Sequence, residues 1–198
     1  MNENKIGIII LAAGSSSRLG QPKQLLQFEG KTLIGRAVES ALKSNCSPVI
    51  AVLGANFQEV KNEIKEPECQ IVLNPRWQTG ISSSIKTGIK KMLEISPQIA
   101  AVIISLTDQP LINSSHFDKL RGTFFETKKP IIASVYHETI GVPALFANEM
   151  FPALLNLEGD HGAKQIIHNH PELVEKFLLS VAAFDIDTLE DLERLKKL

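Results

Sequence analysis

Two cations and a run of small residues lie together near the start of the chain. Residues 12–23 read AAGSSSRLGQPK and follow a short apolar run, with Arg18 and Lys23 as the cations. Small residues let backbone N–H groups approach an anion closely, glycine tolerates a positive φ, and the two cations can neutralise a triphosphate. The spacing matches neither GxxxxGK(S/T) nor GxGxxG. The segment is therefore predicted to bind phosphate, the alternative being a Gly/Ser connector with two exposed cations.

A carboxylate follows a second apolar run. Asp108 lies in the sequence TDQP directly after the apolar residues 100–106. At the carboxyl end of a strand, a carboxylate can hold Mg²⁺, a hard cation that prefers oxygen ligands and could bridge the oxygens of a triphosphate. Taken alone, Asp108 is better explained as the cap of a turn, because Asp-x-Pro is good turn chemistry. Together with the first loop, it predicts a magnesium–nucleotide site.

Two more acidic residues lie near the end of the chain, in the sequence DIDT. Strand alternation would put Asp185 and Asp187 on the same face. Asp187 is a candidate second metal ligand. The alternative is that Asp187 or Thr188 caps the terminal helix.

Two polar segments could meet other parts of a ligand. Residues 74–84 read NPRWQTGISSS and lead into a helix, so they could present hydroxyl and N–H groups or form an ordinary N-cap. Residues 159–164 read GDHGAK and also begin a helix, where capping is the simpler interpretation on chemistry alone. Residues 141–146 read first as a strand with a turn.

Short apolar runs that alternate with amphipathic stretches predict how these segments are positioned. Strands are expected at 5–11, 48–53, 70–73, 100–106, 130–135, 142–146 and 181–186. Helices are expected at 32–44, 57–65, 81–93, 114–125, 148–155, 162–169 and 188–197. This order predicts a three-layer α/β/α sandwich around a mostly parallel sheet, covered on both faces. Ligands bind beyond the carboxyl ends of such strands, which points to the loops after Leu11, Leu73, Leu106 and Phe146.

Composition narrows the class of protein. The 198 residues suit a single α/β domain over 1–198, and the net charge of −1 gives no sign of a nucleic-acid partner. Cys46 and Cys69 are expected to be reduced thiols. No stretch approaches the ~20 apolar residues of a membrane span, and the first apolar run lacks a cleavage site, so a cytoplasmic location is expected.

The first loop carries a family resemblance. LAAGSSSRLGQPK resembles the LAAGxSxRMGxPK signature of the MobA-like nucleotidyltransferases, with Leu19 in place of the commoner Met. The resemblance implies a Rossmann-like, GT-A-like nucleotidyltransferase fold with an NTP-binding half at about 1–110 and an acceptor-binding half at about 111–198. It implies that Arg18 and Lys23 neutralise the phosphates. The nucleotide contacts implied by this loop are Leu11, Ala12, Ala13, Gly14 and Lys23.

Other segments resemble the molybdenum cofactor cytidylyltransferase branch of that family. LTDQP places Asp108 where the family holds its Mg²⁺, and the DxDTxEDL ending suggests that Asp187 shares the metal. NPxWxxGxxxS resembles the segment that faces the base and ribose, which adds Asn74, Gly80, Ser82, Ser83 and Ser84 to the nucleotide contacts. The DQP, GxPxLF and GDxGA elements imply an acceptor side made of Gln109, Pro110, Gly141, Pro143, Gly159, Asp160, Gly162 and Ala163.

The resemblance implies a reaction. CMP would pass from CTP to the molybdopterin form of the molybdenum cofactor, giving molybdopterin cytosine dinucleotide and pyrophosphate, with a molybdoenzyme as a further partner. Transfer of a cytidylyl group to a sugar or polyol phosphate, and transfer of a guanylyl group, are alternatives within enzymes. A non-catalytic chaperone for the cofactor is the alternative outside them, and it would not need Asp108.

Overall fold

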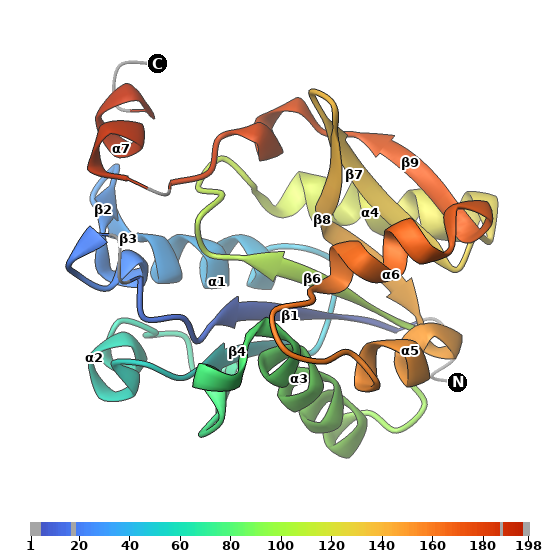
Figure 1. Ribbon diagram of the computed structural model, residues 1–198, viewed down its shortest axis with the longest axis horizontal. Helices are drawn as coiled ribbons and strands as arrows, with labels where there is room; N and C mark the ends of the chain where they lie inside the picture. Colours follow the sequence, from blue (N-terminus) through green and yellow to red (C-terminus); the bar gives the residue numbers. More distant parts are fainter. Residues whose placement is uncertain (1–4, 17–18, 187, 196–198) are drawn as a thin grey trace.

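A seven-stranded sheet forms the centre of the computed structural model, which describes residues 5–16, 19–186 and 188–195 (Figure 1). Along the sheet the strand order is β5-β4-β1-β6-β8-β7-β9. The strands are β1 Ile6–Ala12, β4 Val49–Leu53, β5 Gln70–Leu73, β6 Ala101–Leu106, β7 Ile131–Tyr136, β8 Thr139–Ala147 and β9 Val174–Leu178. β8 runs antiparallel to both of its neighbours, and the other neighbouring pairs are parallel. The expected mostly parallel sheet is therefore confirmed.

Apolar side chains on both faces explain why β1 lies inside the sheet. Ile8 and Ile10 pack into a cluster with buried residues of the helices on one face of the sheet. Ile9 and Leu11 pack into a second cluster with buried residues of the helices on the other face. Because successive side chains of a strand point to opposite faces, a continuous apolar run fills both clusters.

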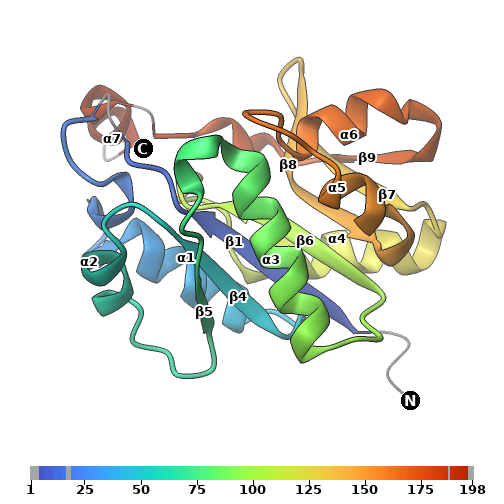
Figure 2. The ribbon, with the colours of Figure 1, turned by 60° about the horizontal axis from the view of Figure 1, so that its bottom comes forward.

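Helices cover both faces of the sheet (Figures 1 and 2). α1 and α4 lie on one face, and α3, α5 and α6 lie on the other, so the expected three-layer arrangement is confirmed. The helices are α1 Leu33–Leu42, α2 Phe57–Asn62, α3 Ile81–Ile95, α4 Ser114–Thr127, α5 Phe151–Leu155, α6 Ala163–Asn169 and α7 Leu189–Leu195. Within the described ranges, none of them is long and apolar enough to cross a membrane.

The expected strand at 181–186 is wrong. Residues Ser180–Ala183 form a 3₁₀ turn (η6), and the last strand is β9, which pairs in parallel with β7. The sequence VEKFL of β9 carries two charges, as an edge strand can, so it does not read as an apolar run. A short hairpin of β2 Gln27–Phe28 and β3 Lys31–Thr32 was also not expected.

The loop after Phe146 does not lie at the ligand edge of the sheet, so that expectation is wrong too. β8 runs antiparallel to β6, and Ala147 pairs with Ala101 at the start of β6. The other end of β8 therefore lies near the end of β6, and it is Gly141 that approaches that edge. Because β8 is reversed relative to β6, the residues before it lie at the ligand edge, and the residues after it lie at the opposite edge.

Candidate active site

A cleft of about 420 Å³ opens beyond the carboxyl ends of β1 and β6. The two strands are neighbours, and Leu11 pairs with Leu106, so the loops that follow them leave the sheet side by side. The start of α3 closes the cleft on another side. Its lining comprises Leu11, Ala12, Ala13, Gly14, Ser15, Ser16, Lys23, Gln24, Trp77, Gln78, Gly80, Ile81, Ser84, Leu106, Thr107, Asp108 and Asp160.

An ion pair joins the two loops across this cleft. The Nζ of Lys23 lies 3.2 Å from Oδ2 of Asp108, and the two side chains are 14% and 21% exposed. Lys23 begins the 3₁₀ turn η2 (Lys23–Leu25), and its backbone N–H donates to the Oγ of Ser16 at 3.0 Å. The cation predicted to meet phosphate and the carboxylate predicted to hold a metal are therefore direct neighbours.

Gln24 holds the first loop in shape. Its Nε2 donates to the carbonyl oxygens of Ala12 at 2.9 Å and Gly14 at 2.8 Å, and its side chain is buried. Both carbonyl oxygens are thus engaged by the protein itself. The sequence assigned Gln24 no role, because only the fold shows which carbonyl groups lie within its reach.

The segment before α3 divides into supporting residues and residues that line the cleft. The Nδ2 of Asn74 donates to the Oγ atoms of Ser83 at 2.8 Å and Ser84 at 3.0 Å, and Asn74 is only 1% exposed. Of the predicted nucleotide contacts in this segment, Gly80 and Ser84 line the cleft, whereas Asn74, Ser82 and Ser83 lie behind it. The buried network fixes the start of the helix. Trp77 and Ile81 line the cleft although no role was assigned to them.

Of the residues predicted to bind the acceptor, those on the loop before α6 fall partly in this same cleft. Asp160 lines it, together with the Gly/Ser loop. Gly159 contacts the start of α3, where its carbonyl oxygen accepts a hydrogen bond from the backbone N–H of Ser82 at 3.2 Å. Ala163 is buried at the first turn of α6, and Gly162 precedes it.

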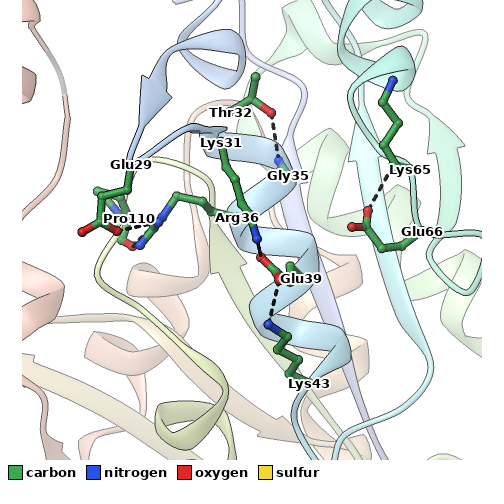
Figure 3. Close-up of polar contacts among 10 residues, drawn as sticks. All are labelled: Glu29, Lys31, Thr32, Gly35, Arg36, Glu39, Lys43, Lys65, Glu66 and Pro110. Atoms are coloured by element: carbon green, nitrogen blue, oxygen red, sulfur yellow. Dashed lines mark hydrogen bonds and ion pairs between the residues drawn. The ribbon is translucent and has the colours of Figure 1, made fainter.

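Gln109 and Pro110 lie on the other side of Asp108 from the Gly/Ser loop. The Nε2 of Gln109 donates to the carbonyl oxygens of Val142 at 3.1 Å and Ala182 at 2.9 Å, and its buried Oε1 has no hydrogen-bond partner among the described residues. The carbonyl oxygen of Pro110 accepts from the guanidinium of Arg36, as Figure 3 shows. These bonds tie the loop after β6 to β8, to the turn η6 and to α1.

Tyr136 lies beside this loop and was missed by the sequence search. A Cβ added at Gly141 would lie 3.1 Å from the Tyr136 hydroxyl, so the glycine makes room for the phenol. Burial raises the pKa of Tyr136, as do the nearby carboxylates of Asp185 and Asp108, and the amide of Gln109 opposes them. No motif marked Tyr136, because only the β7–β8 pairing brings it here. Pro143 is buried in the same strand as Gly141.

The segment that follows the turn η6 also approaches Asp108. The backbone N–H of Ile186 donates to the carbonyl oxygen of Asp108 at 2.9 Å. Asp187 follows directly in sequence, but both it and Arg18 lie outside the described residues. Asp185 is exposed.

The donor chemistry at Asp108 fits a hard divalent cation. Among the described residues, no group of three or more His, Cys, Asp or Glu side chains could form a metal site by itself. Mg²⁺ is commonly held by one or two carboxylates together with substrate phosphates and water, rather than by a cage of protein ligands. A partly exposed carboxylate at the wall of a cleft that also carries Lys23 suits this mode of binding.

The comparison with protein families agrees with this geometry. The model described as the MobA-like NTP transferase domain matches residues 8–174. The chain belongs to the MobA-like NTP transferase family. The resemblance inferred from the first loop is confirmed, and the matched residues include the Gly/Ser loop, Asp108 and the loop before α6.

Two curated proteins of known name are similar to this MobA-like chain. Nicotine blue oxidoreductase of Paenarthrobacter nicotinovorans is 30% identical over 199 residues, which cover 94% of each chain. Molybdenum cofactor cytidylyltransferase of Escherichia coli (strain K12) is 29% identical over 116 residues, which cover 58% of this chain and 57% of that protein. One of these relatives is named as a transferase and the other as an oxidoreductase.

Solved structures share the fold of this MobA-like chain. The crystal structure of Rv0371c from Mycobacterium tuberculosis H37Rv superposes with a TM-score of 0.85 at 24% identity, covering 99% of this chain and 100% of that one. A structure of Rv0371c described as a complex with manganese has a TM-score of 0.81 at 22% identity, covering 98% of each chain. At these identities the likeness shows the fold, which is the expected nucleotidyltransferase fold.

Proposed function

We propose that this protein is a divalent-metal-dependent nucleotidyltransferase that transfers CMP from CTP to the molybdopterin form of the molybdenum cofactor, releasing pyrophosphate. The observation that carries the proposal is the contact between Lys23 and Asp108, 3.2 Å apart. It joins the Gly/Ser loop to the loop after β6 within one cleft of about 420 Å³. That volume lies within the range of roughly 300–1,000 Å³ that small-molecule sites occupy.

The charge of each residue in the cleft suits it to a different part of the metal–nucleotide complex. The Gly/Ser loop and the ammonium of Lys23 receive the triphosphate and stabilise the negative charge that develops on the α-phosphoryl group. Asp108, and Asp187 in the second ligand position, would hold Mg²⁺ or Mn²⁺. When bound, the cation neutralises phosphate oxygens and polarises the α-phosphorus. Trp77 and Ile81 offer apolar surface to the nucleoside.

The transfer needs positioning more than proton removal. An oxygen of the acceptor's terminal phosphate attacks the α-phosphorus in line, the bond from the α-phosphorus to the α–β bridging oxygen breaks, and pyrophosphate takes the electron pair. A phosphate oxygen is already ionised at neutral pH, so the step does not require a general base. The cleft accordingly offers Lys23, Asp108 and the backbone groups of the Gly/Ser loop.

The choice of CTP and of the pterin rests on the sequence and on one relative. The Asp108–Pro110 element resembles the cytidylyltransferase branch, and the similar Escherichia coli protein carries that activity in its name. A guanylyl donor or another phosphorylated acceptor would use the same residues.

An oxidoreductase is the second candidate, because nicotine blue oxidoreductase is 30% identical over nearly the whole chain. The pairing of Lys23 with Asp108 favours transfer, since it provides what a metal–triphosphate complex needs. NADH or NADPH oxidation with an organic electron acceptor is the assay that separates the two candidates.

Pyrophosphate release tests the proposal. Purified protein is incubated with Mg²⁺, molybdenum cofactor and either CTP or GTP, and the dinucleotide product is identified by mass spectrometry. Asp108→Asn should lower the rate by at least about 100-fold, because electrostatic stabilisation of the transition state is lost. Glu149→Gln is the matched control, since Glu149 is exposed at the opposite end of the sheet, and it should leave the rate unchanged.

Three outcomes would contradict the assignment, each in a different way. Pyrophosphate release with GTP but not with CTP would change the assigned nucleotide from CTP to GTP and keep the reaction class. Activation of a molybdoenzyme by Asp108→Asn protein, with no dinucleotide formed, would favour a chaperone. Oxidation of NADH or NADPH without pyrophosphate release would favour the oxidoreductase.

A further inference from the structure

The loop before α6 packs directly against the start of α3. The carbonyl oxygen of Gly159 accepts from the N–H of Ser82 at 3.2 Å. A Cβ added at Gly80 would lie 2.2 Å from that oxygen and 2.7 Å from Oδ1 of Asp160. In Figure 2 this orange loop runs beside the first turn of the green helix. The contact fixes the position of Asp160 relative to the cleft.

Asp160 faces the cleft without a role in holding the fold. It lines the cleft together with Gly14, Trp77 and Ser84. The residue is exposed, and it makes no hydrogen bond or ion pair with the part of the chain that the structure describes. A carboxylate held in a ligand cleft by its backbone, with no partner among the described residues, is available to a ligand.

The charge of Asp160 restricts which part of a nucleotide it can meet. A carboxylate accepts hydrogen bonds and repels phosphate. Among the described residues that line the cleft, the cation is Lys23, and it pairs with Asp108. Near Asp160 the cleft is lined by Trp77, Gly80 and Ile81, which carry no charge. Hydrogen-bond donors on the nucleoside, namely the ribose hydroxyls and the amino group of a base, match such an acceptor.

We propose that Asp160 is a specificity residue that accepts hydrogen bonds from the nucleoside half of the NTP, rather than a residue of the acceptor side. The inference rests on the proposed function, because it requires an NTP in the cleft. It departs from the role that the family resemblance implied for the GDHGA segment. The segment thereby links the nucleotide site to α6, and Gly80 is the point of contact.

Equilibrium binding of CTP in the presence of Mg²⁺ tests this inference. Asp160→Asn should raise the Kd by about 10-fold, as expected when a hydrogen bond to a charged group is weakened. Glu158→Gln removes a carboxylate from the same exposed loop at a position that does not line the cleft, so its Kd should equal that of the wild type. Both substituted residues are exposed, and thermal unfolding is expected to show that both variants fold.

Two analogues identify the donor on the nucleoside. With 2′-deoxy-CTP, the difference between wild type and Asp160→Asn disappears if the ribose is the donor. With UTP, it disappears if the amino group of cytosine is the donor. Either result supports the proposal, as does a reduced difference with both analogues.

A Kd for CTP that is the same in Asp160→Asn, Glu158→Gln and the wild type would overturn it. A raised KM for the acceptor in Asp160→Asn would then return the residue to the acceptor side. In that case the wild type still binds CTP and the proposed function stands. A wild type that binds no nucleotide would overturn both proposals together.

Discussion

Replacing Gly80 with alanine perturbs the contact between the loop before α6 and the start of α3. Gly80 has φ +105° and ψ 170°, a conformation that is essentially restricted to glycine and costs another residue about 1–3 kcal/mol. The new methyl group would also lie 2.2 Å from the carbonyl oxygen of Gly159, so one of the two segments must move. Because the loop is exposed, we expect it to be displaced, which limits the total loss of unfolding free energy to about 2–3 kcal/mol.

Chemical denaturation measures this loss, and Gly122→Ala is the matched control. Gly122 lies within α4, and a Cβ there would meet no atom within 4 Å. That substitution should therefore stabilise the protein by up to about 1 kcal/mol, the difference between glycine and alanine inside a helix. Gly80→Ala should also weaken CTP binding, since it displaces Asp160. A Gly80→Ala variant within about 0.5 kcal/mol of the wild type would refute the reasoning, because changes that small are common at unconstrained surface sites.

Two further predictions concern ionisable groups outside the cleft. Hydrogen bonds from Lys31 and then Lys43 lower the pKa of Glu39 to about 2 (Figure 3). A carboxyl group with a lowered pKa stabilises the fold above its ordinary value of 4.5, and the contribution is lost as the pH falls from there to about 2. Glu39→Gln should cost about 0.5 kcal/mol at pH 7, as exposed ion pairs do, and nothing near pH 2 in denaturation experiments; an equal cost at both pH values would contradict this. Burial raises the pKa of Cys46 to about 11 and of Cys69 to about 12. Both thiols should resist Ellman's reagent at pH 8 in the folded protein and react after unfolding in guanidinium; rapid reaction of the native protein would show that either site opens.

Strand and helix periodicity predicted most of the architecture, because the pattern of apolar residues that an element buries can be read within a short stretch of sequence. The run at β1 is buried at every position, as is typical of a parallel strand covered on both faces. The expected free thiols are confirmed as well, since Cys46 and Cys69 are both free and buried.

The candidate site was predictable where sequence neighbours become spatial neighbours through a parallel pairing. Ala12 ends β1 and Leu106 ends β6, and parallel strands end at the same edge of a sheet. The convergence of Lys23 and Asp108 follows from that rule. The hydrogen bonds made by the side chains of Asn74 and Gln24 do not follow from it. Hydrogen-bond partners depend on side-chain placement to within a fraction of an ångström.

The error at the loop after Phe146 has a physical origin, which is that the apolar pattern does not encode the direction of a strand. Periodicity marks 142–146 as a strand but is the same read in either direction, so the loop after Phe146 was assigned to the wrong edge. Only the pairing of Ala147 with Ala101 reveals the reversal. The reversal is also what brings Gly141 and Tyr136 to Gln109. Residues that follow a strand can be assigned to the ligand edge when its neighbours are parallel, whereas at an antiparallel strand the residues that precede it belong there.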